Sequence, residues 1–127
     1  MSLTKTFEQF EVYQKSIVLA KEVFSLMNHP NFEREYGFKD QIKRAVVSIS
    51  NNIAEGSEYN NNRQFIRFLA HSKGSCAEVR SMLLLSAELG LLDNDKTQKA
   101  IELSIEISKN LSKFMDYLKS RIEPRNL

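Results

Sequence analysis

The chain of 127 residues is long enough for one domain with a sizeable core, and its 42% hydrophobic and 27% charged content is ordinary for a globular protein. A formal net charge of +2 is too small to imply a polyanionic partner by itself. The single cysteine, Cys76, excludes an intrachain disulfide and a multi-cysteine metal site, and we expect it to be buried. The N-terminal stretch lacks a signal-peptide pattern and no apolar run is long enough to span a membrane, so we expect a cytoplasmic protein with one domain, residues 1–127.

The first predicted helix extends from Phe7 to Met27, where apolar residues recur with a helical period. They form two neighbouring lines: Phe10, Tyr13, Ile17, Ala20, Phe24 and Met27 in one, and Val12, Leu19, Val23 and Leu26 in the other. Together these lines make a face wider than one helix–helix seam requires. The helix is therefore either wedged between two helices of its own bundle or partly in contact with another subunit. Asn28, His29 and Pro30 predict its end.

The second predicted helix begins near residues 38–40, after a connector whose aromatic residues Phe32, Tyr36 and Phe38 we expect to cover one end of the bundle. It contains the stretch QIKRAVVSISNNIAEG, residues 41–56, in which apolar and small residues share the helix. Little charge occurs along its middle, so it has no obvious side for water. We interpret it as an inner helix that its neighbours approach closely.

The turn after this helix is predicted at residues 56–62, because Gly56 is followed by three asparagines. Asn61 or Asn62 is expected to cap the third helix, which extends from about Arg63 to Leu89. Its predicted core side consists of Phe65, Leu69, Ser72, Cys76, Val79, Leu83 and Ser86. Gly74 costs about 1 kcal/mol relative to Ala inside a helix, so we expect a neighbouring helix to approach closely there.

Gly90 is placed to end the third helix, and Asp93 or Asn94 to cap a fourth that continues to Ile122 and is stopped by Glu123-Pro124. The expected inward residues of the fourth helix are Ile101, Ile105, Leu111, Met115 and Leu118. Four helices joined by short loops predict an all-α fold, an antiparallel up-down-up-down four-helix bundle.

Two polar residues of the second helix, Asn52 and Glu55, stand out in this pattern. We interpret them as a buried amide and a buried carboxylate, satisfied by hydrogen bonds across the bundle or to an adjacent helix end. His71 is expected on a helix surface or between helices rather than in a catalytic or metal site.

Motifs that carry catalytic chemistry are missing from the sequence. The Glu-x-x-His pairs of di-iron and di-manganese bundles do not occur, and neither does a Gly-rich phosphate loop or a nucleophile elbow. Arg67 lies four positions before His71, which misses the Arg–His spacing of small helical ribonucleases. A general acid–base site could be assembled from Glu55, Glu78 or His71, but no spacing shows that they converge. We expect neither an enzyme nor a cofactor.

Between residues 39 and 80 basic residues outnumber the four acidic ones, Asp40, Glu55, Glu58 and Glu78. The basic residues are Lys39, Lys43, Arg44, Arg63, Arg67, Lys73 and Arg80. Arg63, Arg67 and His71 follow one another at a spacing of four, which places them on one side of a helix. The amides of residues 60–62 and 64 adjoin them. This pattern fits a nucleic-acid contact, although a solvated helix edge would look the same. No aromatic residue is interleaved with these cations in a spacing that guarantees base stacking.

The stretch QIKRAVVSISNNIAEG resembles a signature run of the four-helix-bundle proteins encoded in intervening sequences of bacterial large-subunit ribosomal RNA genes. The matching positions are Gln41, Ile42, Lys43, Arg44, Ala45, Ser48, Ile49, Asn52, Ile53, Ala54, Glu55 and Gly56. A second block matches at Phe65 to Leu69, then at Gly74, Ser75 and Glu78. The chain departs from the family pattern at Ser50-Asn51, where Pro-Ser is common, and at Ser72, where Ala is common.

The resemblance implies a four-helix bundle that assembles as a ring-like homopentamer. It also implies similarity to the accessory variability determinant of diversity-generating retroelements, a basic pentamer that binds nucleic acid and a reverse transcriptase. On this basis we expect a non-enzymatic accessory protein that binds RNA in preference to DNA, with Arg63 and Arg67 as the main phosphate contacts. The alternative is a protein-interaction scaffold that binds no nucleic acid.

Overall fold

The computed structural model describes residues 5–122, which form four long helices and two short 3₁₀ helices. The long helices are α1 (Glu11–Leu26), α2 (Tyr36–Glu58), α3 (Asn62–Glu88) and α4 (Asn94–Ser120), and the 3₁₀ helices are η1 (Phe7–Gln9) and η2 (Pro30–Phe32). The described part of the chain contains no strand, and none of its helices is long and apolar enough to cross a membrane.

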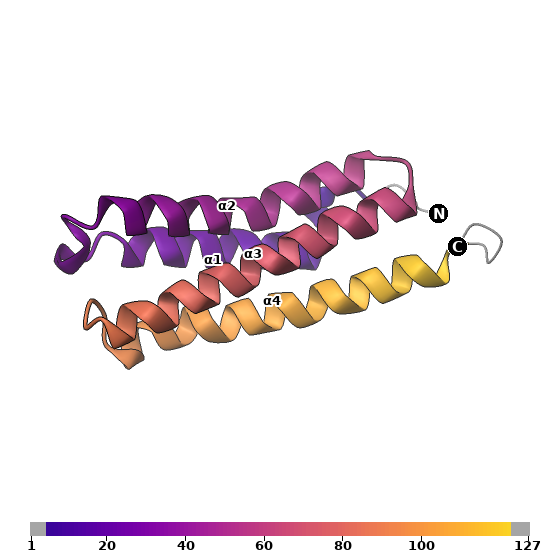
Figure 1. The fold of residues 1–127 in the computed structure, drawn as a ribbon. Coiled ribbons are helices and arrows are strands. Elements are labelled where there is room, and N and C mark those ends of the chain that lie inside the picture. The colour runs from indigo at the N-terminus through magenta and orange to yellow at the C-terminus, as the bar shows by residue number, and fades with distance from the viewer. Residues whose placement is uncertain (1–4, 123–127) are drawn as a thin grey trace.

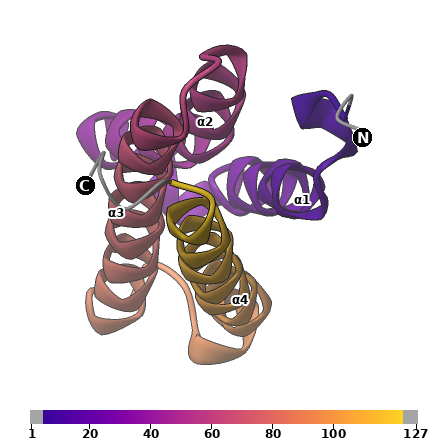
Figure 2. The same cartoon turned by 90° about the vertical axis from the view of Figure 1, so that its right-hand side faces the viewer.

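The helices run alternately up and down the long axis of the molecule, and each packs against its neighbours in the order α1, α2, α3, α4 and back to α1 (Figure 1). The closest associations are those of α3 with α2 and with α4, and Figure 2 shows α3 and α4 running side by side. The turn between α2 and α3 lies at one end of the bundle, while the α1–α2 and α3–α4 connections lie at the other. The predicted all-α four-helix bundle is therefore confirmed.

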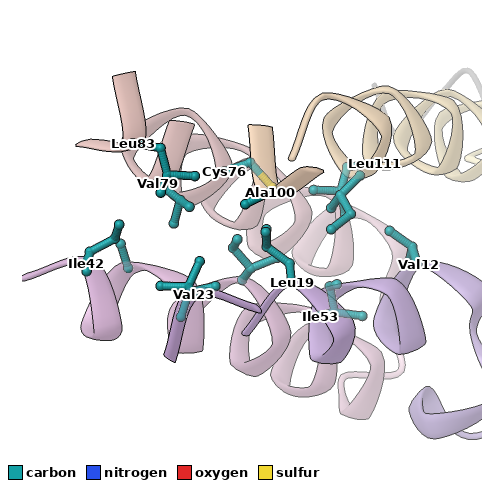
Figure 3. Packing of buried hydrophobic residues seen from close by; sticks show 14 of the residues in the cluster. Val12, Leu19, Val23, Ile42, Ile53, Cys76, Val79, Leu83, Ala100 and Leu111 are labelled. Atoms are coloured by element: carbon teal, nitrogen blue, oxygen red, sulfur yellow. The ribbon is translucent and has the colours of Figure 1, made fainter. Parts of the chain in front are cut away.

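The core of the bundle is continuous along its length (Figure 3). In α3 the seven residues predicted to face it are all buried, including Cys76, which behaves as a small hydrophobic residue. Ser72 Oγ donates a hydrogen bond to the Ile49 carbonyl oxygen at 2.8 Å, so this hydroxyl links α3 to α2 inside the core. The departure from the family pattern at Ser72 is thus accommodated by a polar contact.

The two apolar lines predicted for α1 are buried to different degrees, although the first line also contributes the buried Met27. Val12, Leu19 and Val23 of the second line are buried, whereas Ile17 and Phe24 are 37% and 41% exposed. α1 packs against both α2 and α4, and the stripe that these two helices cover leaves Ile17 and Phe24 at its edge. The helix also starts at Glu11 rather than Phe7 and ends at Leu26.

The inner-helix interpretation of α2 is wrong for the single subunit, because Arg44, Val47 and Asn51 face solvent. Of the long helices, only α1 and α3 pack on α2, and its third side stays open. Gly56 was predicted in a turn but lies within α2, which continues to Glu58. It is buried, and a Cβ at this position would lie 2.7 Å from Phe68 Cβ. Gly56 therefore allows α3 to approach α2 closely.

Gly74, for which a close approach was predicted, faces solvent and would have no atom within 4 Å of an added Cβ. It lies on the side of α3 away from the core. The predicted close contact at Gly74 is therefore wrong, and the glycine at a close helix–helix approach is Gly56.

The helix caps agree with the sequence. Asn61 Oδ1 accepts a hydrogen bond from the Gln64 amide at 3.0 Å, and Asp93 Oδ1 accepts one from the Lys96 amide at 3.0 Å. Gly90 has a φ of +74°, the left-handed conformation typical of a residue that ends a helix, and Leu91 N donates to the Ser86 carbonyl oxygen at 2.9 Å.

α4 ends at Ser120, and the predicted stop at Glu123-Pro124 lies outside the described residues. Of its expected inward residues, Leu111 and Leu118 are buried, Ile101 and Met115 are half-buried, and Ile105 is 37% exposed. Ile105 was wrongly placed because the buried stripe of α4 includes small and polar residues instead: Thr97, Ala100 and Ser104.

Aromatic residues fill both ends of the bundle. At the α1–α2 end Phe32 is buried and its ring stacks on Phe38 with centroids 5.5 Å apart, while Tyr36 is 73% exposed and covers nothing. At the α2–α3 end the rings of Phe10, Phe65 and Phe114 pack together, with the last two 5.1 Å apart. This second cluster fixes the end of the bundle at which the candidate site lies.

Candidate nucleic-acid interface

Two guanidinium groups project at the start of α3, where the cap of Asn61 fixes the first turn of the helix. Arg63 and Arg67 are exposed, and together with Asn61 and Gln64 they line an open hollow of about 280 Å³, here called the cationic hollow. Within residues 5–122 neither guanidinium takes part in an ion pair. The hollow therefore offers two charged donors and two amide side chains to an anion.

His71 continues this line one turn after Arg67 and is exposed, as expected for a surface histidine. Its side chain lies outside the set that lines the cationic hollow. A cation at this position would extend the edge of the hollow along α3.

The basic residues at the start of α2 lie elsewhere. Arg44 Nε is 3.0 Å from Asp40 Oδ2, so its charge is paired. Lys43 Nζ lies 5.1 Å from the ring centroid of Phe24. Lys39 packs in the same way on a tyrosine of its own helix. These residues lie toward the start of α2, about 20–30 Å at 1.5 Å per residue from the end of the helix that adjoins the cationic hollow.

Lys73 and Arg80 are also separated from the cationic hollow. Lys73 is exposed near the middle of α3, and Arg80 is half-buried about 25 Å from Arg63 along the helix axis. The seven predicted basic residues are thus spread over the length of the described bundle, and Arg63 and Arg67 are the two that line the cationic hollow.

The polar residues of α2 differ from the prediction. Asn52 is half-buried, and its Nδ2 donates to the Ser48 carbonyl oxygen at 2.8 Å and to Ser48 Oγ at 2.9 Å. Ser75 Oγ lies 2.9 Å from Ser48 Oγ, so the network continues into α3. Asn52 is therefore satisfied mainly within its own helix and reaches α3 through Ser48.

Glu55 is exposed, and the prediction of a buried carboxylate is wrong. It lies on the open third side of α2. With Glu58 and Tyr59 it lines a second open hollow, of about 340 Å³, here called the aromatic hollow.

The residues considered for acid–base chemistry are not brought together. Glu78 accepts a hydrogen bond from Gln41 Nε2 and lies about 10 Å along α3 from His71, whereas Glu55 belongs to the aromatic hollow on α2. Within residues 5–122 no group of three or more His, Cys, Asp or Glu side chains is placed to hold a metal ion.

Tyr59, at the end of α2, was missed by the sequence analysis. It is 51% exposed, and its ring stacks on Phe68 with centroids 5.2 Å apart and an interplanar angle of 24°. An exposed aromatic ring therefore lies at the same end of the bundle as Arg63 and Arg67. The available signal was its position directly before the turn asparagines, four residues from Arg63.

A family model described as the 23S rRNA-intervening sequence protein matches residues 8–113. Among solved structures, the chain is similar to a crystal structure of a protein with unknown function from the S23 ribosomal protein family of Bacteroides thetaiotaomicron. The two share 24% identity, the similarity covers 82% of this chain and 97% of that chain, and the TM-score of 0.76 shows a common fold. No curated protein matches the chain. Because the family match spans most of the sequence, including residues 41–56, the chain belongs to the 23S rRNA-intervening sequence protein family.

Proposed function

We propose that this protein is a non-enzymatic, oligomeric accessory protein that binds RNA through the cationic hollow. The observation that carries the proposal is the pair of exposed guanidinium groups, Arg63 and Arg67, placed with two amide side chains around one hollow. Guanidinium groups donate paired hydrogen bonds to phosphate oxygens, and amide side chains can donate further ones. Contacts to phosphate groups do not distinguish one base from another, so binding would be mainly electrostatic and would depend little on the RNA sequence.

RNA is favoured over DNA by the family to which the chain belongs, since its description refers to intervening sequences of 23S rRNA. The lysines and arginines outside the hollow, Lys39, Lys43, Arg44, Lys73 and Arg80, would serve as supporting contacts on a longer RNA.

Assembly of several subunits is supported by apolar side chains that the single subunit leaves exposed. Ile17 and Phe24 of α1 and Val47 of α2 face solvent. These side chains belong to neighbouring helices, because α1 and α2 pack together and Lys43 of α2 lies over the Phe24 ring. We propose a homopentamer, which would carry a charge of about +10 because each subunit contributes +2. Static light scattering gives the molar mass, and a stable monomer at micromolar concentration would contradict the proposal.

RNA binding is tested by a mobility-shift titration at several salt concentrations. The logarithm of the affinity should fall with the logarithm of salt by about 0.7 for each phosphate contact on a single strand. The double variant Arg63→Gln/Arg67→Gln should bind more weakly and have a shallower slope. Lys96→Gln/Lys109→Gln is the matched control, because it removes the same net charge from exposed lysines of α4 that belong to none of the proposed contacts. Equal effects of both variants would refute the assignment of the site, and the absence of any salt-dependent shift would refute RNA binding.

The second candidate is a protein-interaction scaffold, favoured by three exposed leucines near the end of α3. Leu84, Leu85 and Leu89 are each about half exposed, at the end of the bundle opposite the cationic hollow. This alternative predicts an assembled protein without RNA affinity and a protein partner that stays bound after nuclease treatment.

A further inference from the structure

We infer that the α2–α3 end of the bundle binds an unpaired nucleotide whose base stacks on Tyr59 while its phosphate contacts Arg63 and Arg67. The inference rests on the proposed function and narrows it, because it specifies single-stranded RNA in place of duplex RNA. It follows from the position of one aromatic ring, which lines the aromatic hollow and lies two residues before Asn61 of the cationic hollow.

The Tyr59 ring is suited to stacking because one of its faces is supported and the side chain is still 51% exposed. Its parallel stack with Phe68 covers one face of the ring. The opposite face is therefore the one that a base can cover. Base–aromatic stacking of this kind is a general means of holding single strands, since every base has a π-face.

The support beneath Tyr59 is rigid. Phe68 is half-buried and packs against Gly56, where α2 and α3 approach so closely that a Cβ on the glycine would clash with Phe68. The Tyr59 amide donates to the Gly56 carbonyl oxygen at 3.3 Å, which holds the backbone at the end of α2. A platform that is already ordered loses little entropy when a base binds to it.

The charges around the turn differ between the two hollows, so one hollow suits the base of a nucleotide and the other suits its phosphate. Glu55 and Glu58 line the aromatic hollow with Tyr59 and repel a phosphate, but their carboxylates can accept hydrogen bonds from the N–H groups of a base. Arg63 and Arg67, in the cationic hollow, attract the phosphate. Tyr59 and Asn61 belong to one short turn and their Cα atoms are at most about 7 Å apart, so one nucleotide can reach both hollows.

The other exposed tyrosines are arranged differently. Lys39 Nζ lies 5.4 Å from the ring centroid of Tyr36, and Arg121 Cζ lies 5.6 Å from that of Tyr117. A cation of the same chain therefore already lies over each of these two rings. Tyr59 instead stacks on another aromatic ring. Tyr36 is also at the far end of α2, which makes it a suitable control.

The test measures binding of a fluorescently labelled single-stranded RNA and of a hairpin duplex by anisotropy. We expect Tyr59→Leu to weaken single-strand binding by on the order of tenfold, as for loss of one stacked base, without changing the salt slope or duplex binding. Tyr59→Phe should bind as the unmodified protein does, because the ring is kept. Tyr36→Leu should have no effect on either RNA.

The outcomes separate this inference from the proposed function. If Tyr59→Leu binds single strands normally while the salt dependence remains steep, stacking is refuted and electrostatic RNA binding stands. If the unmodified protein binds neither RNA, both are refuted. Circular dichroism checks the fold of each variant. Should Tyr59→Leu not fold, an abasic RNA of the same length replaces it: weaker binding of the abasic strand to the unmodified protein supports stacking, and equal binding refutes it.

Discussion

Replacing Gly56 with alanine tests whether α2 and α3 meet as closely as the structure shows. The added methyl group would lie 2.7 Å from Phe68 Cβ and 2.8 Å from Phe65 Cδ1. Phe68 Cβ is attached directly to the backbone of α3, so the clash cannot be relieved by rotating the end of a side chain. Forcing an extra methyl group into a packed core costs about 1–3 kcal/mol, and the upper part of that range, about 2–3 kcal/mol, applies here because an atom attached to the backbone must move. The helix propensity gained over Gly returns about 1 kcal/mol. We expect a net loss of about 1–2 kcal/mol of unfolding free energy.

Gly74→Ala is the matched control, because it makes the same chemical change inside a helix of the same bundle. No atom lies within 4 Å of the new methyl group, so only the helix propensity changes. We expect a gain of about 0.5–1 kcal/mol.

Urea unfolding followed by far-ultraviolet circular dichroism gives both free energies, and all variants must be compared at one subunit concentration because assembly contributes to stability. The two alanine variants should move the midpoint in opposite directions with unchanged slope. The reasoning is refuted if Gly56→Ala is as stable as the unmodified protein. It is equally refuted if Gly74→Ala is destabilised to the same degree.

Three further predictions follow from named hydrogen bonds and from the buried thiol. Asn61→Ala removes the cap of α3 and should cost about 1 kcal/mol, measured by urea unfolding, whereas Asn60→Ala should be neutral because Asn61 provides the cap. Ser72→Ala should cost about 1 kcal/mol, since it removes the hydrogen bond to the Ile49 carbonyl oxygen, and a neutral result would contradict that bond. Burial raises the pKa of the Cys76 thiol from 9.0 to about 12. Between these values the unfolded chain loses the thiol proton and the folded chain keeps it, so the contribution of Cys76 to stability should fall as pH rises through this range and be constant below it. Cys76→Ala should remove this part of the pH dependence.

Much of the fold could be predicted because its signals are local. The core side of α3 follows from a period that seven residues share, and the caps at Asn61, Gly90 and Asp93 follow from the chemistry of their own side chains. Each of these features depends on residues within one or two helical turns. The sequence therefore contains the whole signal.

The errors arose where the answer depends on which helices lie beside a residue. Gly56 and Gly74 are both helical glycines, and nothing in their own sequence context shows that α3 crosses α2 at the first and solvent faces the second. In α1 two apolar lines compete for the core, and the position of α2 and α4 decides in favour of Leu19 and Val23 over Ile17.

The candidate site was predicted only in part, for the same reason. Arg63 and Arg67 could be assigned to one site because they lie one turn apart on one helix. The remaining cations are close in sequence number to one another, but antiparallel helices place them at different levels of the bundle. Tyr59 belongs to α2 and becomes significant only through its contact with Phe68 of α3.

The close approach at Gly56 connects the fold to the proposed site. It brings α3 near enough for Phe68 to pack on α2, and Phe68 in turn supports the Tyr59 ring beside the cationic hollow. A methyl group at Gly56 should therefore displace Phe68 and disturb the ring that stacks on it. If the Tyr59 ring is a base platform, Gly56→Ala will weaken single-strand binding more than duplex binding and leave the salt slope unchanged. Equal weakening for both RNAs would instead mean that the site responds only to the loss of overall stability.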